Sequence, residues 1–320
     1  MTSFNATLPF NLVTYDPPFY HTSRPSVIPG VSDPTLALAA PVIAYWLTSL
    51  IFHTFDISSW KWLDRYRIHD SSEVASRNLA TRFQVVRAVL FQQAIQTVIG
   101  YFWVSGDDKP YLNDGSPLAM LPIAIPLTRA MVWVLGERSA TRLLREVGPQ
   151  LVHFIYWWAI PAFQLLFAMF VMDTWQYFLH RAMHLNKFLY KHLHSVHHRL
   201  YVPYAFGALY NHPLEGFLLD TTGAGLAEML SFLSVRQATF FFILSVCKTV
   251  DDHCGYNFPL DPLQMLSGNT ADYHDIHHQV IGIKSNFSQP FFVHWDILLG
   301  TRLTREEVNL RRQKTRAKMT

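Results

Sequence analysis

The sequence DTWQYFLHRAMHLNKFLYKHLHSVHHR occupies residues 173–199 and contains two closely spaced groups of histidines. The first group is His180 and His184, and the second is His194, His197 and His198. Residues three or four apart on a helix share one face, so the imidazoles of each group can point toward one place. This spacing indicates a metal site built on helices.

A third group, His274, His277 and His278 in DYHDIHHQV, repeats the spacing of the second group. Eight of the 16 histidines therefore fall in clusters of the form HxxxH, HxxHH and HxxHH. A lone HxxxH is more often a polar helix face, but clustered imidazoles in an apolar protein are costly unless they share a cation. Imidazole suits iron, zinc, copper and nickel, and one structural zinc needs only four ligands. We expect two ions, with a pair of structural zinc ions as the alternative.

The composition is that of a membrane protein. The chain has 320 residues, of which 50% are hydrophobic and 15% charged, and its mean hydropathy is +0.12. The net charge of +3 gives no indication of a nucleic-acid partner, and Cys247 and Cys254 are too few for a disulfide framework. No nucleotide-binding motif is present. Any redox cofactor besides the metal must therefore come from another protein.

Long apolar segments predict an all-α integral membrane protein with about four transmembrane helices. The segments are residues 35–55, 85–104, 151–172 and a hairpin at 216–247, together with 118–135. Pro122 and Pro126 interrupt the last of these, which is either a kinked span or an interfacial helix. Polar side chains inside the segments should pair between helices; these are Gln92, Gln93, Gln96, Asp220 and Glu228.

Basic residues set the expected orientation and boundaries. Residues 56–82 are rich in Arg and Lys, which favours the cytosol for this segment. The Lys and Arg neighbours of the histidine clusters favour the cytosolic face for them too, which requires 118–135 to be interfacial or a later hairpin to restore the side. The expected divisions are an irregular tail over 1–34, a membrane-embedded domain over 35–303 and a basic tail over 304–320. Asn5 begins a glycosylation sequon in the lumenal tail, whereas the sequon at Asn286 should stay unmodified.

Other side chains near the clusters are candidates for the same site. His212 and His253 are expected at the same depth and are predicted as further ligands, with hydrogen-bonded interfacial residues as the alternative. Asn257 is a weaker candidate ligand. Metal-bound histidines usually donate their other N–H to a carboxylate or carbonyl. The acids expected in this role, unless they are solvated loop residues, are Asp173, Glu215, Asp251, Asp252, Asp272 and Asp275.

The three histidine boxes, and NFSQPFFVHWDILLGT at residues 286–301, resemble the fatty acid hydroxylase or sterol desaturase superfamily of membrane di-iron enzymes. The resemblance covers about residues 35–303. Within it, the sequences at 180–221 and 250–264 look most like the sphingoid-base C4-hydroxylases of fungi and plants. One departure concerns Asn257, which occupies the second position of a further HxxxH found in the fatty acid 2-hydroxylase branch.

This resemblance implies a multi-pass enzyme of the endoplasmic reticulum with two Fe ions, for which zinc can substitute during purification. It would insert one oxygen atom from O₂ at C4 of sphinganine or dihydroceramide, giving a phytosphingosine-type base. Electrons would come from NAD(P)H through cytochrome b5 and its reductase. The resemblance also admits other sphingolipid enzymes as partners.

The substrate is the least constrained expectation. A methylene C–H bond is unactivated, so the reaction needs a metal centre in a dry pocket, which apolar helices can supply. Candidates to hold the amino-alcohol head group are Tyr204, Tyr210, Asn211 and Tyr256. The rival functions are a sterol desaturase or sterol C4-methyl oxidase on the same scaffold, and a non-enzymatic membrane metal-binding protein. The sequence leaves open whether the free base or the ceramide is preferred.

Overall fold

The structure, a computed structural model, describes residues 8–13, 15–22, 24–105, 116–265 and 267–318. Within these ranges the chain is helical, and its β-pairing is limited to isolated bridges of Ile28 with Val31 and Arg67 with Tyr256. The predicted all-α fold is confirmed. The chain divides into two compact units, one of Met1–Asp33 with Asp107–Leu166 and the other of Pro34–Gly106 with Phe167–Thr320.

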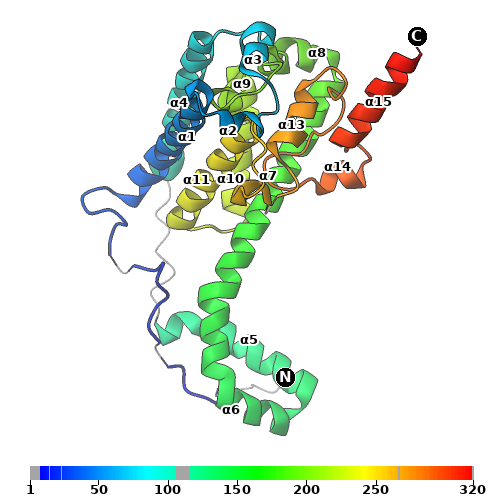
Figure 1. Ribbon diagram of the computed structural model, residues 1–320. Helices are drawn as coiled ribbons and strands as arrows, with labels where there is room; N and C mark the ends of the chain where they lie inside the picture. The colour runs from blue at the N-terminus through cyan, green and yellow to red at the C-terminus, as the bar shows by residue number, and fades with distance from the viewer. Residues whose placement is uncertain (1–7, 14, 23, 106–115, 266, 319–320) are drawn as a thin grey trace. The chain divides into compact units, whose positions relative to one another are not determined.

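The first unit contains the helices labelled α5 and α6 in Figure 1. They are α5 (Pro117–Leu135) and α6 (Glu137–Phe154), followed by η1 (Ile155–Ala159) and the start of α7 (Ile160–Leu185). Ser116 caps α5 by accepting the N–H of Ala119, and Gly136 ends it with a φ of 75°. The described part of the N-terminal tail is irregular, and its Phe10 packs in the core beside Leu144.

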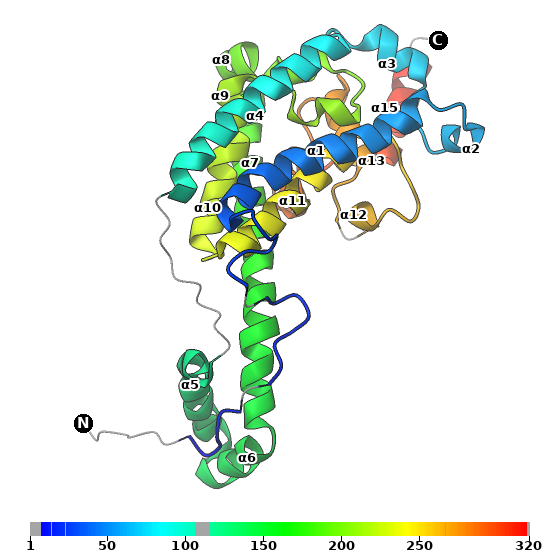
Figure 2. The same ribbon diagram turned by 90° about the vertical axis from the view of Figure 1, so that its left-hand side faces the viewer.

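The second unit holds the histidine clusters. Its helices are α1 (Asp33–Ile57), α2 (Lys61–Asp64), α3 (Ser71–Arg77), α4 (Arg82–Ser105), the rest of α7, α8 (Lys187–Leu189), η2 (Tyr190–His194), η3 (His197–Arg199), η4 (Ala205–Leu209), α9 (Pro213–Gly216), η5 (Phe217–Thr221), α10 (Thr222–Leu230), α11 (Val235–Asp252), α12 (Pro262–Met265), α13 (Ala271–His278), α14 (His294–Leu298) and α15 (Arg305–Ala317). Figure 2 shows α1 and α4 crossing the same side of this unit.

The core of the second unit forms around the short helix η4. Tyr45 of α1, Val89 of α4 and Val250 of α11 all belong to the cluster of buried residues that includes η4. The Tyr45 hydroxyl also donates a hydrogen bond of 2.7 Å to the Phe206 carbonyl. This packing fixes η4, which directly follows the second histidine cluster in the chain.

The apolar segments form helices suited to a membrane. Those long and apolar enough to cross one, within the described residues, are Asp33–Ile57, Pro117–Leu135 and Glu137–Leu185. On α1, large apolar side chains such as Ile43 and Leu47 are more than half exposed, which is the pattern of a lipid-facing helix. The segment with Pro122 and Pro126 is one of these three helices, and both prolines lie inside it. The prediction of a membrane protein is confirmed.

Polar side chains inside the predicted spans pair between helices. Gln92 of α4 donates to Asp220 of η5 at 3.0 Å, and Gln93 accepts the indole N–H of Trp46 at 2.9 Å. Glu228 of α10 accepts the indole N–H of Trp103 at 3.2 Å. The expected interhelical pairing is therefore confirmed for Gln92, Gln93, Asp220 and Glu228, whereas Gln96 is only half-buried.

The last two predicted segments also form helices. Residues 213–230 and α11 make the two arms of the predicted hairpin, and Ser234 with Gln237 forms a capping box at the start of the second arm. The basic C-terminal segment is the helix α15, which Thr304 and Glu307 cap in the same way. Arg305 at its start pairs with Asp272 and Asp275 of α13, so α15 lies beside α13 (Figure 1).

Gly216 allows α4 to pack closely against α9. A Cβ atom at Gly216 would lie 2.4 Å from the Gln92 side chain, whereas one at Gly225 would make an ordinary contact of 3.8 Å with Trp103. We expect Gly216→Ala to destabilise the protein by about 1–3 kcal/mol and to lower its melting temperature in detergent, because the Gln92 amide would have to move and lose its hydrogen bond to Asp220. Gly225→Ala is the matched control and should change stability by less than about 1 kcal/mol. Equal melting temperatures for the two variants would contradict this packing.

Candidate metal centre

Nine histidines form two buried groups. One nitrogen from each member of a group lies within 4.8 Å of the corresponding nitrogens of the other members. The first group is His180, His184, His194, His198 and His277, and the second is His197, His253, His274 and His278. The structure thus brings together all eight box histidines and adds His253. Each of the nine is at most 8% exposed.

Helical spacing delivers these side chains. His180 and His184 lie one turn apart near the end of α7, and His194 ends η2 while η3 begins at His197. The third box lies on α13, and His253 directly follows α11. Asn186 accepts two backbone N–H groups at the start of α8, which caps the turn between the first two boxes.

In the first group, nitrogen lone pairs converge. The Nδ1 atom of His180 lies 2.8 Å from the Phe287 carbonyl, so Nδ1 carries the proton and Nε2 carries the lone pair. His194 is fixed in the same way by Glu215, whose carboxylate lies 2.5 Å from Nδ1. The two Nε2 atoms nevertheless lie 3.0 Å apart, and that of His194 is 2.7 Å from Nε2 of His184. A cation between these atoms would remove the repulsion.

The second group repeats this arrangement. Nδ1 of His253 lies 2.8 Å from the Thr249 carbonyl, and Nδ1 of His278 lies 2.8 Å from the Leu200 carbonyl. Both Nε2 atoms therefore carry lone pairs, and they lie 3.0 and 3.1 Å from Nε2 of His274. A single proton on His274 could satisfy only one of these two neighbours.

Burial keeps the imidazoles neutral, as metal ligation requires. It lowers the pKa of His197 to about 4, even though hydrogen bonds to Tyr210 and Asn211 oppose the shift. Burial likewise lowers the pKa of His253 and His277 to about 3. The pKa values of the other box histidines outside the spans are lowered well below their ordinary value, first by burial and then by neighbouring imidazoles; these are His194, His198, His274 and His278.

The donor set fits two metal ions. Nε2 of His277 is buried and has no hydrogen-bond partner among the described residues, although its Nδ1 is held by the Ser285 carbonyl at 2.7 Å. This nitrogen is the one left for the first group. Ring centroids of His198 and His278 lie only 4.8 Å apart, so the two groups adjoin. The first group supplies five neutral nitrogen donors and the second supplies four, which suits two adjacent transition-metal ions.

The acidic side chains expected beside the histidine clusters contact different kinds of group. The Glu215 carboxylate accepts the Nδ1–H of His194. Asp173 instead accepts the backbone N–H groups of Phe291 and Phe292, and Asp252 pairs with Lys248 and the Asn269 amide. Asp251 accepts from the Gln264 amide. Asp272 and Asp275 bind Arg305, and Asp275 also contacts His69 at 2.7 Å.

Two predicted ligands lie outside both groups. Nδ1 of His212 accepts the backbone N–H of Leu214 at 3.2 Å, which caps α9. Asn257 has an exposed side chain and donates its backbone N–H to the Tyr66 carbonyl. Neither residue therefore belongs to the two histidine groups.

The candidate head-group residues are buried, and some of their polar groups already form hydrogen bonds within the protein. Tyr256 donates to Asp56 at 3.1 Å, and the Tyr210 carbonyl holds His197. Asn211 also hydrogen-bonds to His197. The Tyr204 hydroxyl is buried without a hydrogen-bond partner within the described part of the chain. Their role in binding a head group stays a prediction.

Sequence reasoning missed the backbone carbonyls and one buried acid. Asp296 accepts the N–H groups of Phe287 and Ser288 at 3.0 and 2.8 Å, and the Tyr273 hydroxyl at 2.8 Å. It therefore fixes the loop whose Phe287 carbonyl orients His180. The sequence could have indicated this role, because Asp296 lies in the largely apolar stretch NFSQPFFVHWDILLGT, where a buried acid needs hydrogen-bond partners.

Glu215 should matter more to metal binding than Asp272. Removing the carboxylate in Glu215→Ala leaves Nδ1 of His194 without its acceptor, and we expect metal affinity to fall about 10- to 100-fold. Asp272→Asn alters a contact with Arg305 only and should retain full metal content. Elemental analysis of the two purified variants, equilibrated with a chelator series, measures the difference. Equal affinities would refute this assignment of partners.

Comparisons with known proteins agree with this geometry. The fatty acid hydroxylase family profile matches residues 165–301, which contain all nine histidines. The chain is 46% identical to sphingolipid C4-hydroxylase SUR2 of Saccharomyces cerevisiae, over 87% of this chain and 74% of that protein. It is 44% identical to sphingolipid C4-hydroxylase sur2 of Schizosaccharomyces pombe, over 89% and 93%.

A differently named relative matches almost as well. Very-long-chain aldehyde decarbonylase GL1-9 of Oryza sativa subsp. indica is 43% identical over 85% of this chain and 90% of that protein. No solved structure matches the chain. The long matches at these identities, together with the family profile over the histidine boxes, show that the chain belongs to the fatty acid hydroxylase family and is an oxygenase of that family.

Proposed function

We propose that this protein hydroxylates C4 of a long-chain sphingoid base, as the free base or within a ceramide. The observation that carries the proposal is the double group of buried histidines in a chain that matches two yeast sphingolipid C4-hydroxylases over most of its length. One oxygen atom of O₂ becomes the new hydroxyl and the other leaves as water. The two electrons and two protons that balance the reaction come from outside the chain.

The protein's own residues provide the site and exclude water. Five histidines would hold one ion and four the other, and bound iron would supply the activation of O₂. Glu215 and backbone carbonyls keep Nδ1 of His194, His180 and His253 protonated and thereby direct their Nε2 lone pairs inward. Apolar helices provide a path for the acyl chain, since each CH₂ transferred from water contributes about 0.8 kcal/mol.

We further propose that the electrons reach the metals from NAD(P)H through cytochrome b5 and its reductase. The absence of a nucleotide-binding motif in the sequence supports a separate donor. We also propose that the enzyme lies in the endoplasmic reticulum with its metal centre and C-terminal helix facing the cytosol. A cytosolic electron donor could then reach the metals, and the basic residues of 56–82 favour the same side. Asn286 is expected to stay unmodified in either orientation, because its amide is fully buried and donates to the carbonyls of Tyr273 and Leu303.

Aldehyde decarbonylation is the second candidate, because the rice relative carries that name at nearly equal identity. The same nitrogen donors could serve either reaction, so the products must distinguish them. A decarbonylase would yield a hydrocarbon one carbon shorter than the aldehyde. A sterol oxidase, which the sequence also admits, would change sterols and leave sphingoid bases unaltered.

Expression in cells that lack their own C4-hydroxylase tests the function. Under ¹⁸O₂, mass spectrometry should find sphingoid bases carrying one labelled oxygen at C4, because the inserted atom comes from the gas. Shortened hydrocarbons, or altered sterols with unchanged bases, would replace the proposal by one of the alternatives. His277→Ala should abolish the labelled product, since it removes a nitrogen of the first group. Product from this variant at the wild-type rate would rule out the metal assignment.

The orientation has its own test. An epitope tag placed after Thr320 should be digested by protease added to intact microsomes, because α15 is expected on the cytosolic side. A glycan should be found at Asn5, which lies outside the described residues, and none at Asn286. Protection of the tag until detergent is added would reverse the assignment of the two faces.

A further inference from the structure

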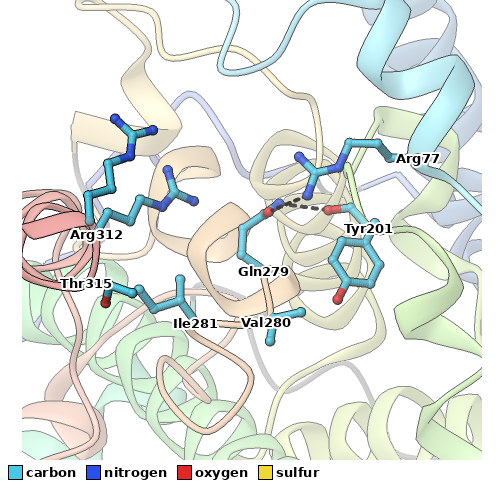
Figure 3. Close-up of a pocket in the computed structure, with 8 residues that line it drawn as sticks. Arg77, Tyr201, Gln279, Val280, Ile281, Arg312 and Thr315 are labelled. Atoms are coloured by element: carbon cyan, nitrogen blue, oxygen red, sulfur yellow. Dashed lines mark hydrogen bonds between the residues drawn. The ribbon is translucent and has the colours of Figure 1, made fainter. Parts of the chain in front are cut away.

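A pocket of about 430 Å³ lies between α3, α13 and α15, apart from the histidine groups. Figure 3 shows Arg77 and Tyr201 on one side of it, Arg312 on the opposite side, and Gln279 between them. The full lining is Arg77, Tyr201, Gln279, Val280, Ile281, Arg312, Thr315 and Arg316. Three of these residues are arginines and none is acidic.

Two of the arginines have no counter-charge. Arg312 and Arg316 lie one turn apart on α15, and both are exposed. No carboxylate among the described residues lies within ion-pair distance of either. Three guanidinium groups around one small cavity repel one another, and a bound anion would turn that repulsion into attraction. The alternative is a solvated basic surface that binds small ions without preference.

Arg77 is held in place before any ligand arrives. Its guanidinium donates to Glu73 at 3.0 Å and to the Gln279 side-chain oxygen at 3.2 Å, and it lies over the Tyr201 ring at 5.6 Å. Gln279 in turn is buried and donates to the Tyr201 carbonyl at 2.9 Å (Figure 3). Such preorganisation lowers the entropy cost of binding.

We propose that this pocket binds a phosphate-type oxyanion. Arginine forks pair bidentately with phosphate oxygens, and charge-assisted hydrogen bonds of this kind are about twice as strong as neutral ones. The pocket volume accommodates a phosphate group with part of a substituent, and Val280 and Ile281 offer that substituent an apolar wall. The group could belong to free phosphate or to the head of an anionic lipid, since both present the same oxygens.

The pocket is connected to the second histidine group through neighbouring residues. The Leu200 carbonyl holds Nδ1 of His278 at 2.8 Å, and the next residues of the two segments, Tyr201 and Gln279, pair at 2.9 Å. Gln279 and Tyr201 both line the pocket. An occupant that contacts Arg77 would therefore act on the hydrogen-bonded pair that lies next to the contact orienting His278. This inference does not depend on which lipid the enzyme hydroxylates.

Thermal unfolding of the full chain in neutral-lipid nanodiscs tests the proposal. Inorganic phosphate, titrated at constant ionic strength with chloride, should raise the melting temperature with saturation. The double variant Arg312→Gln with Arg316→Gln should raise the apparent Kd for phosphate by at least about 10-fold, because each lost bond to a charged group costs a factor of that order. The matched control, Arg311→Gln with Lys314→Gln, removes the same charge from α15 outside the pocket and should bind like the wild type.

A second arm distinguishes the source of the group. Discs containing phosphatidic acid are compared with phosphatidylcholine discs in the absence of free phosphate. If phosphatidic acid stabilises the wild type and the control pair but not Arg312→Gln with Arg316→Gln, the site binds a lipid head group. If only free phosphate stabilises the wild type, the site binds a soluble anion. If neither probe stabilises the wild type, or if both pairs of variants respond equally, the surface is merely solvated and the proposal is overturned.

Discussion

The arrangement of the second unit depends on which ring nitrogen of its clustered histidines carries the proton. A carbonyl or carboxylate lies at Nδ1 of His180, His194, His253 and His278, and this contact leaves the Nε2 lone pair facing other lone pairs at about 3 Å. Such a centre is unfavourable without cations and becomes favourable with them. Metal binding would therefore stabilise the folded second unit, since two of the orienting carbonyls come from segments distant in sequence: that of Phe287 at His180 and that of Leu200 at His278.

Those carbonyls need support of their own, and buried polar groups provide it. Asp296 binds the backbone around Phe287, and Asn286 ties the same loop to Tyr273 and Leu303. Asp173 accepts two N–H groups farther along the loop, at Phe291 and Phe292. The loop between α13 and α14 is thus tied to α7 and α13 by hydrogen bonds and has a defined position without regular structure, which a ligand-orienting carbonyl requires.

Sequence spacing predicted the helical fold and the convergence of the eight box histidines, because both follow from the period of the helix. The sequence also indicated His253, from its expected depth at the end of the hairpin, and Glu215, and the structure places both in contact with box histidines. Spacing could not separate His253 from His212, since one ends a helix that points at the site while the other caps α9 with its own ring. It also could not identify carbonyl partners, because every residue carries one and only tertiary contacts select which is used.

The nature of those partners bears on reactivity. A carboxylate at Nδ1 increases the basicity of the imidazole and offsets the charge of a bound ion, whereas a carbonyl orients the ring with little charge. Among the described residues, Glu215 is the carboxylate that contacts an Nδ1 atom of the two histidine groups. The other identified partners of these Nδ1 atoms are backbone carbonyls. Two dications here would keep most of their positive charge. Burial excludes water from them, so that charge would be available to bind and polarise an electron-accepting molecule such as O₂.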